Sequence, residues 1–338
     1  MGSHRRLVPT SGFNRGAGTA LCVLSAATAA LGAVPAHAAP HTDTKAEVDR
    51  LYEEAEKATQ AYDKADETAA TLRREVGQAQ DGIARQQQRI NTMRDALGSL
   101  AGAQYRSGGI DPTVALLFSD DPADYLDKAS TLDRISAHQA GRLRELRSAL
   151  RELAQERAEA AGKLAELQKS RTAVAAHKKT VERKLAKARQ LLNSLPFGQR
   201  AAYDRASRSG GGGIPDLSGV VPPDARVAAA IAAARSALGR PYVWGATGPS
   251  GFDCSGLMQW SYAHAGVHLP RTSQEQRFAG RQVPLSQAQP GDLVVYRSDA
   301  SHVAMYVGNG QVIHAPYPGA PVRYDRVNMM PVSSVTRV

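Results

Sequence analysis

Aromatic residues and cysteines are scarce in this sequence. Only 5% of the 338 residues are Phe, Trp or Tyr, and the chain contains two cysteines. The chain is longer than one ordinary domain needs, yet it has few of the bulky side chains that fill a globular core. Ala, Gln, Glu, Lys and Arg crowd its first two thirds instead, which predicts a long helical part with little core of its own.

Acidic residues are absent from the first 38 positions. Arginines at positions 5, 6 and 15 precede an apolar run over 17–34, and Ala36-His37-Ala38 then forms a small-x-small cleavage pattern. This order predicts a secretory signal peptide over 1–38, removed before Ala39. A membrane anchor is the alternative, although the run is short for a span and only weakly apolar. No later segment is apolar enough to span a bilayer.

Removal of the signal would leave one cysteine. Cys22 lies inside the apolar run, where a lipid-attachment site fits poorly, so the mature chain keeps only Cys254. A single cysteine excludes an intramolecular disulfide, and a lone thiol in an exported protein either pairs between chains or performs chemistry. The formal charge falls from +10 to +7, because three arginines and no acid are lost. A basic exported protein meets anionic wall polymers and lipid headgroups first, so no nucleic-acid partner is expected.

Apolar residues recur at spacings of three and four from Val48 to Leu100, and only Gln86 departs from the pattern. A second run with the same period extends from Leu143 to Leu195. Its exceptions are long cations that can keep their charge in water: Arg157, Arg171 and Lys178. Heptads sustained over this length indicate a coiled coil. Two matched helices predict an antiparallel hairpin, with pairing between chains as the alternative.

Glycine and proline mark the boundaries of the helical part. The segment 107–112 must break a helix, and an apolar stretch over 113–119 follows in poor heptad register. We expect a hairpin over 39–206 with a small tip lobe near 106–125, which either caps the hairpin or docks a partner. Residues 207–224 contain four consecutive glycines and three prolines, which indicate a flexible linker.

A globular domain is expected over 225–338. A helix that starts at Ser255 would place Cys254 in its first turn, where free backbone N–H groups and the helix dipole favour the reactive thiolate. His302 and His314 fall on consecutive strands joined by a Gly-Asn-Gly turn. The two imidazoles should therefore lie near each other at one end of a small antiparallel sheet.

These residue types suit nucleophilic catalysis. The hypothesis is that Cys254 is the nucleophile, His302 the base, and His314 the group that fixes the tautomer of the base. A backbone N–H near Cys254 and the Tyr242 hydroxyl would hold the oxyanion. The same three triad residues could instead bind zinc, but their spacing matches no common zinc pattern. No metal or cofactor is expected.

Five motifs in this domain carry a resemblance. They are Tyr-Val-Trp-Gly from 242, Asp-Cys-Ser-Gly from 253, Pro-Arg-Thr-Ser from 270, Pro-Gly-Asp-Leu from 290 and Ser-His-Val-Ala-Met-Tyr-Val-Gly from 301. In this order they resemble the NlpC-type (NlpC/p-sixty) cell-wall cysteine peptidases. The resemblance implies an α+β papain-like C-terminal domain, with helices packed on a small antiparallel sheet, preceded here by the long antiparallel α-helical coiled coil.

The resemblance also implies the reaction and the site. It predicts hydrolysis of peptidoglycan stem peptides, usually between γ-D-glutamate and the diamino acid, by the triad Cys254, His302 and His314. Four further positions line the site in relatives: Tyr242, Asp253, Ser255 and Arg271. Three of them have a structural alternative: Asp253 as a helix cap, Arg271 as an ion-pair partner and Tyr242 as core packing.

The helical part is similar, less specifically, to the coiled coils of exported wall hydrolases controlled by the division complex FtsE–FtsX. That likeness implies that the tip docks on FtsX and that the hairpin restrains the catalytic domain. The sequence thus predicts a secreted, cell-wall-associated peptidoglycan endopeptidase. Two alternatives stay open: a wall-binding adaptor that activates another hydrolase, and an acyl-transferring enzyme of similar fold.

Overall fold

The computed structural model describes residues 41–338 except 107–113, 115–121 and 210–214. The expected signal peptide, most of the tip lobe and part of the linker therefore lie outside the described residues. The expected fold class is confirmed, because two long helices precede a domain in which helices pack on a small antiparallel sheet. Within the described part of the chain, no helix is both long enough and apolar enough to cross a membrane.

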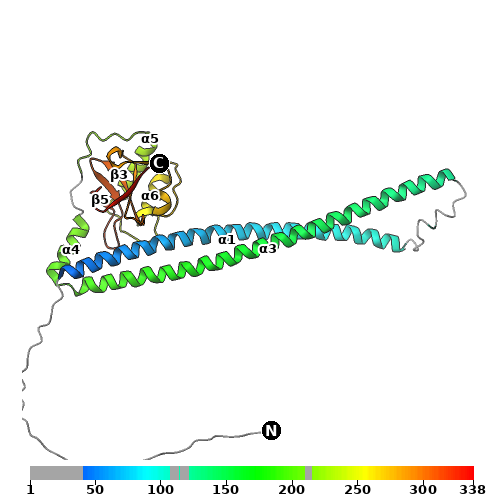
Figure 1. The fold of residues 1–338 in the computed structure, drawn as a ribbon, viewed down its shortest axis with the longest axis horizontal. Coiled ribbons are helices and arrows are strands. Elements are labelled where there is room, and N and C mark those ends of the chain that lie inside the picture. Colours follow the sequence, from blue (N-terminus) through cyan, green and yellow to red (C-terminus); the bar gives the residue numbers. More distant parts are fainter. Residues whose placement is uncertain (1–40, 107–113, 115–121, 210–214) are drawn as a thin grey trace, which may run out of the picture. The chain divides into compact units, whose positions relative to one another are not determined.

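Two long helices form the hairpin: α1 (His41–Arg106) and α3 (Pro122–Ser194). They lie side by side over much of their length (Figure 1). They run antiparallel, because Leu51 near the start of α1 clusters with Leu185 near the end of α3, whereas Ile90 clusters with Ala149. The helices therefore pair within one chain, as the matched heptads predicted.

The seam of the hairpin follows the predicted positions closely on α1. The buried seam residues there are Val48, Leu51, Ala55, Ala69, Leu72, Val76 and Ile90. On α3 the prediction was wrong for Leu143 and Leu164, which are 46% and 55% exposed, while Leu167 is buried. A helix repeats every ~3.6 residues, so a strict heptad drifts off the buried face unless the pair supercoils to match it.

The C-terminal domain consists of short helices and a six-stranded sheet. After α4 (Phe197–Ser209), the elements are α5 (Ala225–Ser236), α6 (Cys254–Ala263), α7 (Ser273–Gln276), β1 (Arg281–Val283), the 3-10 turn η1 (Leu285–Gln287), β2 (Leu293–Tyr296), β3 (His302–Gly308), β4 (Gln311–His314), β5 (Arg323–Arg326) and β6 (Val332–Arg337). The strand order is β1-β6-β2-β3-β4-β5, and all neighbours are antiparallel. The β3–β4 turn holds Asn309 at φ 50° between two glycines of positive φ, a conformation that glycine adopts without strain.

The sheet is covered on both faces, which makes it a rigid base for the site. One face packs with α5 and α6 through aliphatic side chains: Ile231, Leu257, Met258, Val295, Val303 and Met305. The other face buries a second set: Val283, Val294, Ala304, Val312 and Val335. The Tyr262 hydroxyl of α6 also donates to the Gly291 carbonyl at 2.5 Å, just before β2. Helix α6 is thereby fixed against the sheet whose strands β3 and β4 carry the histidines.

Candidate active site

Cys254 is the first residue of α6 and is fully buried. The residue before it, Asp253, caps the helix, because its Oδ1 accepts a hydrogen bond from the Gly256 N–H at 2.7 Å. Gly256 has no room for a side chain, since a Cβ there would lie 2.2 Å from the Ala246 carbonyl oxygen. The Asp-Cys-Ser-Gly motif is thus a tight helix start that fixes the thiol in place.

The thiol is not activated in this arrangement. Burial raises the pKa of Cys254 well above its usual value, and the carboxylates of Glu56 and Asp253 raise it further. A hydrogen bond from the Val303 N–H acts in the opposite direction but is smaller. The expectation that the helix start would favour a thiolate is therefore wrong for this arrangement, because desolvation and two nearby carboxylates outweigh it.

The two histidines are linked in a relay that ends on a carboxylate. His302 Nε2 lies 2.8 Å from His314 Nδ1, and His314 Nε2 lies 2.8 Å from Asp325 Oδ2. Burial lowers the pKa of His314 to about 4 and so keeps its ring neutral. Since Asp325 accepts, the single proton of His314 is on Nε2, and its Nδ1 accepts from His302. The relay leaves the Nδ1 of His302 as the nitrogen that faces the thiol.

Asp325 was missed in the sequence. It lies on β5, the strand that pairs with β4. His314 of β4 lies opposite Arg323 of β5, and Asp325 is two residues beyond Arg323 on that strand. The Arg323 Nε donates to the Asp325 carboxylate at 2.7 Å, which fixes the acceptor. An acidic residue on the strand beside β4 can reach the His314 ring, so the sequence did contain a signal. The signal could not be used, because no strand was predicted after His314.

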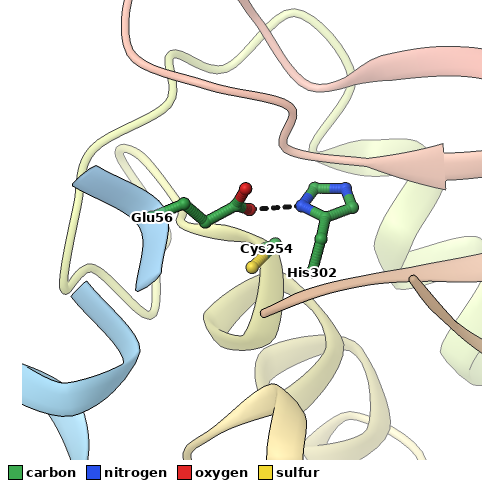
Figure 2. Close-up of side chains that lie close together, drawn as sticks. All are labelled: Glu56, Cys254 and His302. Carbon is green, nitrogen blue, oxygen red and sulfur yellow. Dashed lines mark hydrogen bonds and ion pairs between the residues drawn. The ribbon is translucent and has the colours of Figure 1, made fainter. Parts of the chain in front are cut away.

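A residue of the coiled coil binds the ring nitrogen of His302 that the predicted triad needs as the acceptor of the Cys254 proton. Glu56 of α1 forms a hydrogen bond with His302 Nδ1, and its other oxygen accepts from Arg297 at 2.6 Å. Figure 2 shows this carboxylate pointing at the imidazole, with the Cys254 sulfur beside both. Burial would raise the pKa of Glu56, but His302 and Arg297 outweigh it and hold that pKa below its usual value. His302, the predicted base, is thus paired with an ionised carboxylate instead of the thiol.

Gln60, one helical turn further along α1, covers the sulfur of Cys254. Its Nε2 lies 3.6 Å from Cys254 Sγ and donates to Ser255 Oγ at 3.2 Å. Its Oε1 accepts from the backbone N–H and the hydroxyl of Ser273, at 2.7 and 3.0 Å. A neutral carboxamide therefore fills the space in front of the sulfur, with its carbonyl oxygen already bound by two donors.

Asp63 completes the face that α1 presents to the site. It pairs at 3.1 Å with Arg271, which also holds Asp253 and donates to Ser255. Burial, followed by the Asp253 charge, raises the pKa of Asp63 to about 8. Its Oδ2 is buried without a hydrogen-bond partner among the described residues. Glu56, Gln60 and Asp63 lie at i, i+4 and i+7 on one side of the helix, and we call them the blocking triplet.

Aromatic and ionic contacts flank the blocking triplet. Tyr62 packs edge-on against Trp244 at 5.1 Å, and Tyr52 stacks on Tyr317 at 5.2 Å. Lys57 pairs with Asp299 at 3.1 Å. The contact is thus made by several side chains on each side. In the heptad pattern Tyr62 is a seam position and the charged α1 residues look like an ordinary solvated face, so this contact could not be predicted from the sequence.

The structure brings the predicted site residues together. Hydrogen bonds link Cys254, Asp253, Ser255 and Arg271 to one another or to the blocking triplet, and His302 and His314 form the relay. Tyr242 is buried in the domain core. Burial raises its pKa well above the usual value, and the charges of Glu56 and Cys254 raise it further. Their roles in catalysis stay predictions.

The domain and its site define a class: a papain-like cysteine-peptidase fold with a helix-start thiol and a strand-borne imidazole. Residues 239–337 match the NlpC/P60 family, and this part of the chain is an NlpC/P60 domain. The resemblance seen in its motifs is confirmed.

Curated relatives share this domain and differ in total length. The chain is 47% identical over 109 residues to a probable endopeptidase of Corynebacterium glutamicum, which covers 32% of this chain and 52% of that protein. It is 45% identical over 114 residues to a probable endopeptidase of Mycobacterium tuberculosis, which covers 33% of this chain and 30% of that protein. The chain thus spans about half or less of these relatives' length.

Solved structures of the family match the same share of the chain. The crystal structure of the NlpC/p60 domain of the peptidoglycan hydrolase SagA is 38% identical, with 33% of this chain and 98% of that chain covered at a TM-score of 0.32.

Proposed function

We propose that this chain is a secreted, cell-wall-associated peptidoglycan endopeptidase that its own coiled coil holds inactive. The observation that carries the proposal is the relay from Asp325 through His314 to His302, which leaves one imidazole nitrogen facing Cys254. A thiol beside an oriented base is the arrangement that nucleophilic amide hydrolysis requires. The names of the relatives, probable endopeptidases, support the same reaction class.

The chemistry follows from this geometry once Glu56 has left. His302 Nδ1 takes the proton of Cys254, and the thiolate attacks the carbonyl carbon of a stem-peptide amide. The negative oxygen that forms would be held by donors at the start of α6. The imidazolium then gives its proton to the leaving amine as the C–N bond breaks, and a thioester remains. Water, deprotonated by His302, attacks the thioester and restores the thiol.

The proposed substrate is the γ-D-glutamyl to diamino acid bond, as the NlpC-type motifs imply. Once α1 has left the site, Arg271 and Ser255 would contact the substrate with the groups that now contact α1. Asp63 shows that the Arg271 guanidinium has room for a second carboxyl group beside Asp253. A stem peptide carries carboxyl groups, which supports a substrate contact in addition to the ion pair with Asp253.

The blocking triplet supports inhibition by the hairpin. Glu56 binds the proton-accepting nitrogen of His302, and Gln60 covers the sulfur of Cys254. Asp63 pairs with the guanidinium of Arg271. A substrate therefore has to displace α1 before it meets any of the three groups. An external agent that pulls on the hairpin would free the site. By its sequence likeness the coiled coil would receive such an agent, of the FtsE–FtsX type, at the tip near 106–125.

Mass analysis of muropeptides tests the reaction. The variant Glu56→Ala/Gln60→Ala should cleave them with addition of water, whereas addition of an amine would indicate acyl transfer. Adding Cys254→Ala or His302→Ala to that variant should abolish cleavage. An active Cys254→Ala protein would refute the mechanism. If the released variant binds muropeptides and never cleaves them, the adaptor function replaces the peptidase.

A further inference from the structure

The blocking contact assembles a set of metal-binding atoms. One ligand atom each from Glu56, Cys254 and His302 lies within 4.8 Å of the other two, and all three residues are buried (Figure 2). The atoms are a carboxylate oxygen, a sulfur and an imidazole nitrogen. Two come from the peptidase domain and one from α1. The complete set therefore exists only while α1 lies in the site.

These donors suit zinc. Zn²⁺ binds Cys sulfur, His nitrogen and carboxylate oxygen at about 2.0–2.3 Å, and three protein ligands with one open position form a common coordination. Donors of a tetrahedral site at those bond lengths are roughly 3.5 Å apart. Atoms already within 4.8 Å of one another reach that geometry through small side-chain shifts, in which Glu56 moves away from the His302 ring.

Two of the three ligands, His302 and Glu56, already have an outer partner that fixes their orientation. His302 can donate its other ring N–H to His314, which is held by Asp325. The second oxygen of Glu56 is held by Arg297. Zinc-binding histidines and carboxylates commonly carry such hydrogen bonds. His314, considered as a zinc ligand from sequence, is instead a supporting residue, and Glu56 takes the third position.

The charges of the buried cluster balance around a divalent cation. The thiolate of Cys254 and the carboxylate of Glu56 together neutralise Zn²⁺, while the protons of the thiol and of His302 Nδ1 leave to solvent. Arg297 keeps a counter-charge in Glu53, whose carboxylate lies 3.8 Å away. A cavity of about 310 Å³ lined by Glu56, Arg297 and His314 lies beside the cluster and provides a route for the ion.

We propose that Glu56, Cys254 and His302 form a zinc site that locks α1 onto the peptidase domain. Bound zinc occupies the nucleophile and the base together and ties both to the coiled coil. Release of the enzyme then requires loss of the ion as well as movement of the helix. The regulatory consequence rests on the proposed function, whereas the binding of the ion can be tested without any substrate.

The test is a titration of the full chain with Co²⁺, which replaces Zn²⁺ and reports its ligands by absorption. We expect one equivalent to bind with an intense sulfur-to-cobalt band and the visible bands of a tetrahedral ion, both erased by Zn²⁺. Glu56→Gln removes one ligand and keeps the size of the side chain. It should weaken binding by about 100-fold or more, at least the loss expected for a metal-supporting residue.

Glu67→Gln is the matched control. It is the same substitution further along α1, at an exposed position outside the cluster. It should bind Co²⁺ as the unchanged chain does. Cys254→Ser should lose the sulfur band, and a thermal midpoint should rise with Zn²⁺ in the unchanged chain but not in Glu56→Gln. Two results would overturn the proposal: no sulfur band at stoichiometric Co²⁺, or equal affinity in Glu56→Gln. Neither depends on whether muropeptides are cleaved.

Discussion

The side-chain amide of Gln60 lies 3.6 Å from the sulfur of Cys254, although 194 positions separate the two residues. The amide is anchored from the other side by the Ser273 N–H at 2.7 Å. A coiled-coil residue therefore occupies hydrogen-bond donors of the peptidase domain beside the thiol. The relationship links the state of the hairpin directly to access to the thiol.

Gln60→Ala should free the nucleophile. In the docked state the substitution would leave the buried Ser273 N–H without its acceptor, at a cost of about 1–3 kcal/mol. Docking should weaken correspondingly, by roughly 5- to 150-fold, since each 1.4 kcal/mol is a factor of ten. The rate of alkylation of Cys254 by iodoacetamide measures this directly. Gln88→Ala, at an exposed position of α1, is the control and should alkylate as slowly as the unchanged chain.

The docking of α1 should also weaken as the pH rises. Burial and Asp253 raise the pKa of Asp63 from 3.8 to about 8 in the docked state, with Asp66 adding to the shift and Arg271 opposing it. A group whose pKa is raised on docking favours docking fully below 3.8, and that contribution is lost progressively as the pH approaches about 8. We expect Cys254 to become more accessible between pH 6 and 8.

Asp63→Asn separates this effect from ordinary thiol ionisation. The amide has the size of the carboxyl group, carries no charge at any of these pH values and can donate to Asp253. The rate of Cys254 alkylation in the unchanged chain, divided by the rate in Asp63→Asn, should increase from pH 6 to 8. A constant ratio would show that Asp63 does not titrate in the contact.

Much of the fold could be predicted because its signals are local. Heptad spacing specified the helices, and the turn around Asn309 placed His302 and His314 on paired strands. The blocking triplet could not be predicted, because Glu56 and Gln60 look like solvated positions of a coiled coil. Only the three-dimensional docking of α1 shows that both are buried. The thiol pKa was mispredicted for the same reason, since its burial and one of its carboxylate neighbours come from that docking.

Asp325 should act as a positioning residue for the base. Asp325→Asn can donate an N–H to His314 Nε2, and the ring proton of His314 would then move to Nδ1. With a proton on Nδ1, His314 could no longer accept the hydrogen bond from His302. In the released background Glu56→Ala/Gln60→Ala, kcat should fall by about 10- to 100-fold, the range given for outer hydrogen-bond partners of a site, with little change in KM. Asp325→Glu should restore part of the rate. A role limited to folding would instead lower the thermal midpoint and leave the kcat of the folded enzyme intact.

Arg271 should matter for stability as well as for docking. Its side chain is only 10% exposed and faces two buried carboxyl groups, Asp253 at 2.5 Å and Asp63 at 3.1 Å. Arg271→Ala would leave the Asp253 carboxylate without its cation, and breaking a buried pair in this way costs about 3–5 kcal/mol. Arg271→Lys should cost less, because the charge remains, but lysine cannot bond Asp253 and Ser255 together as the guanidinium does. Thermal unfolding midpoints measure the order of stability of these variants. The control is Arg281→Ala, at an exposed position of β1, which should leave the midpoint unchanged. A midpoint for Arg271→Ala equal to that of Arg281→Ala would contradict a buried ion pair at this position.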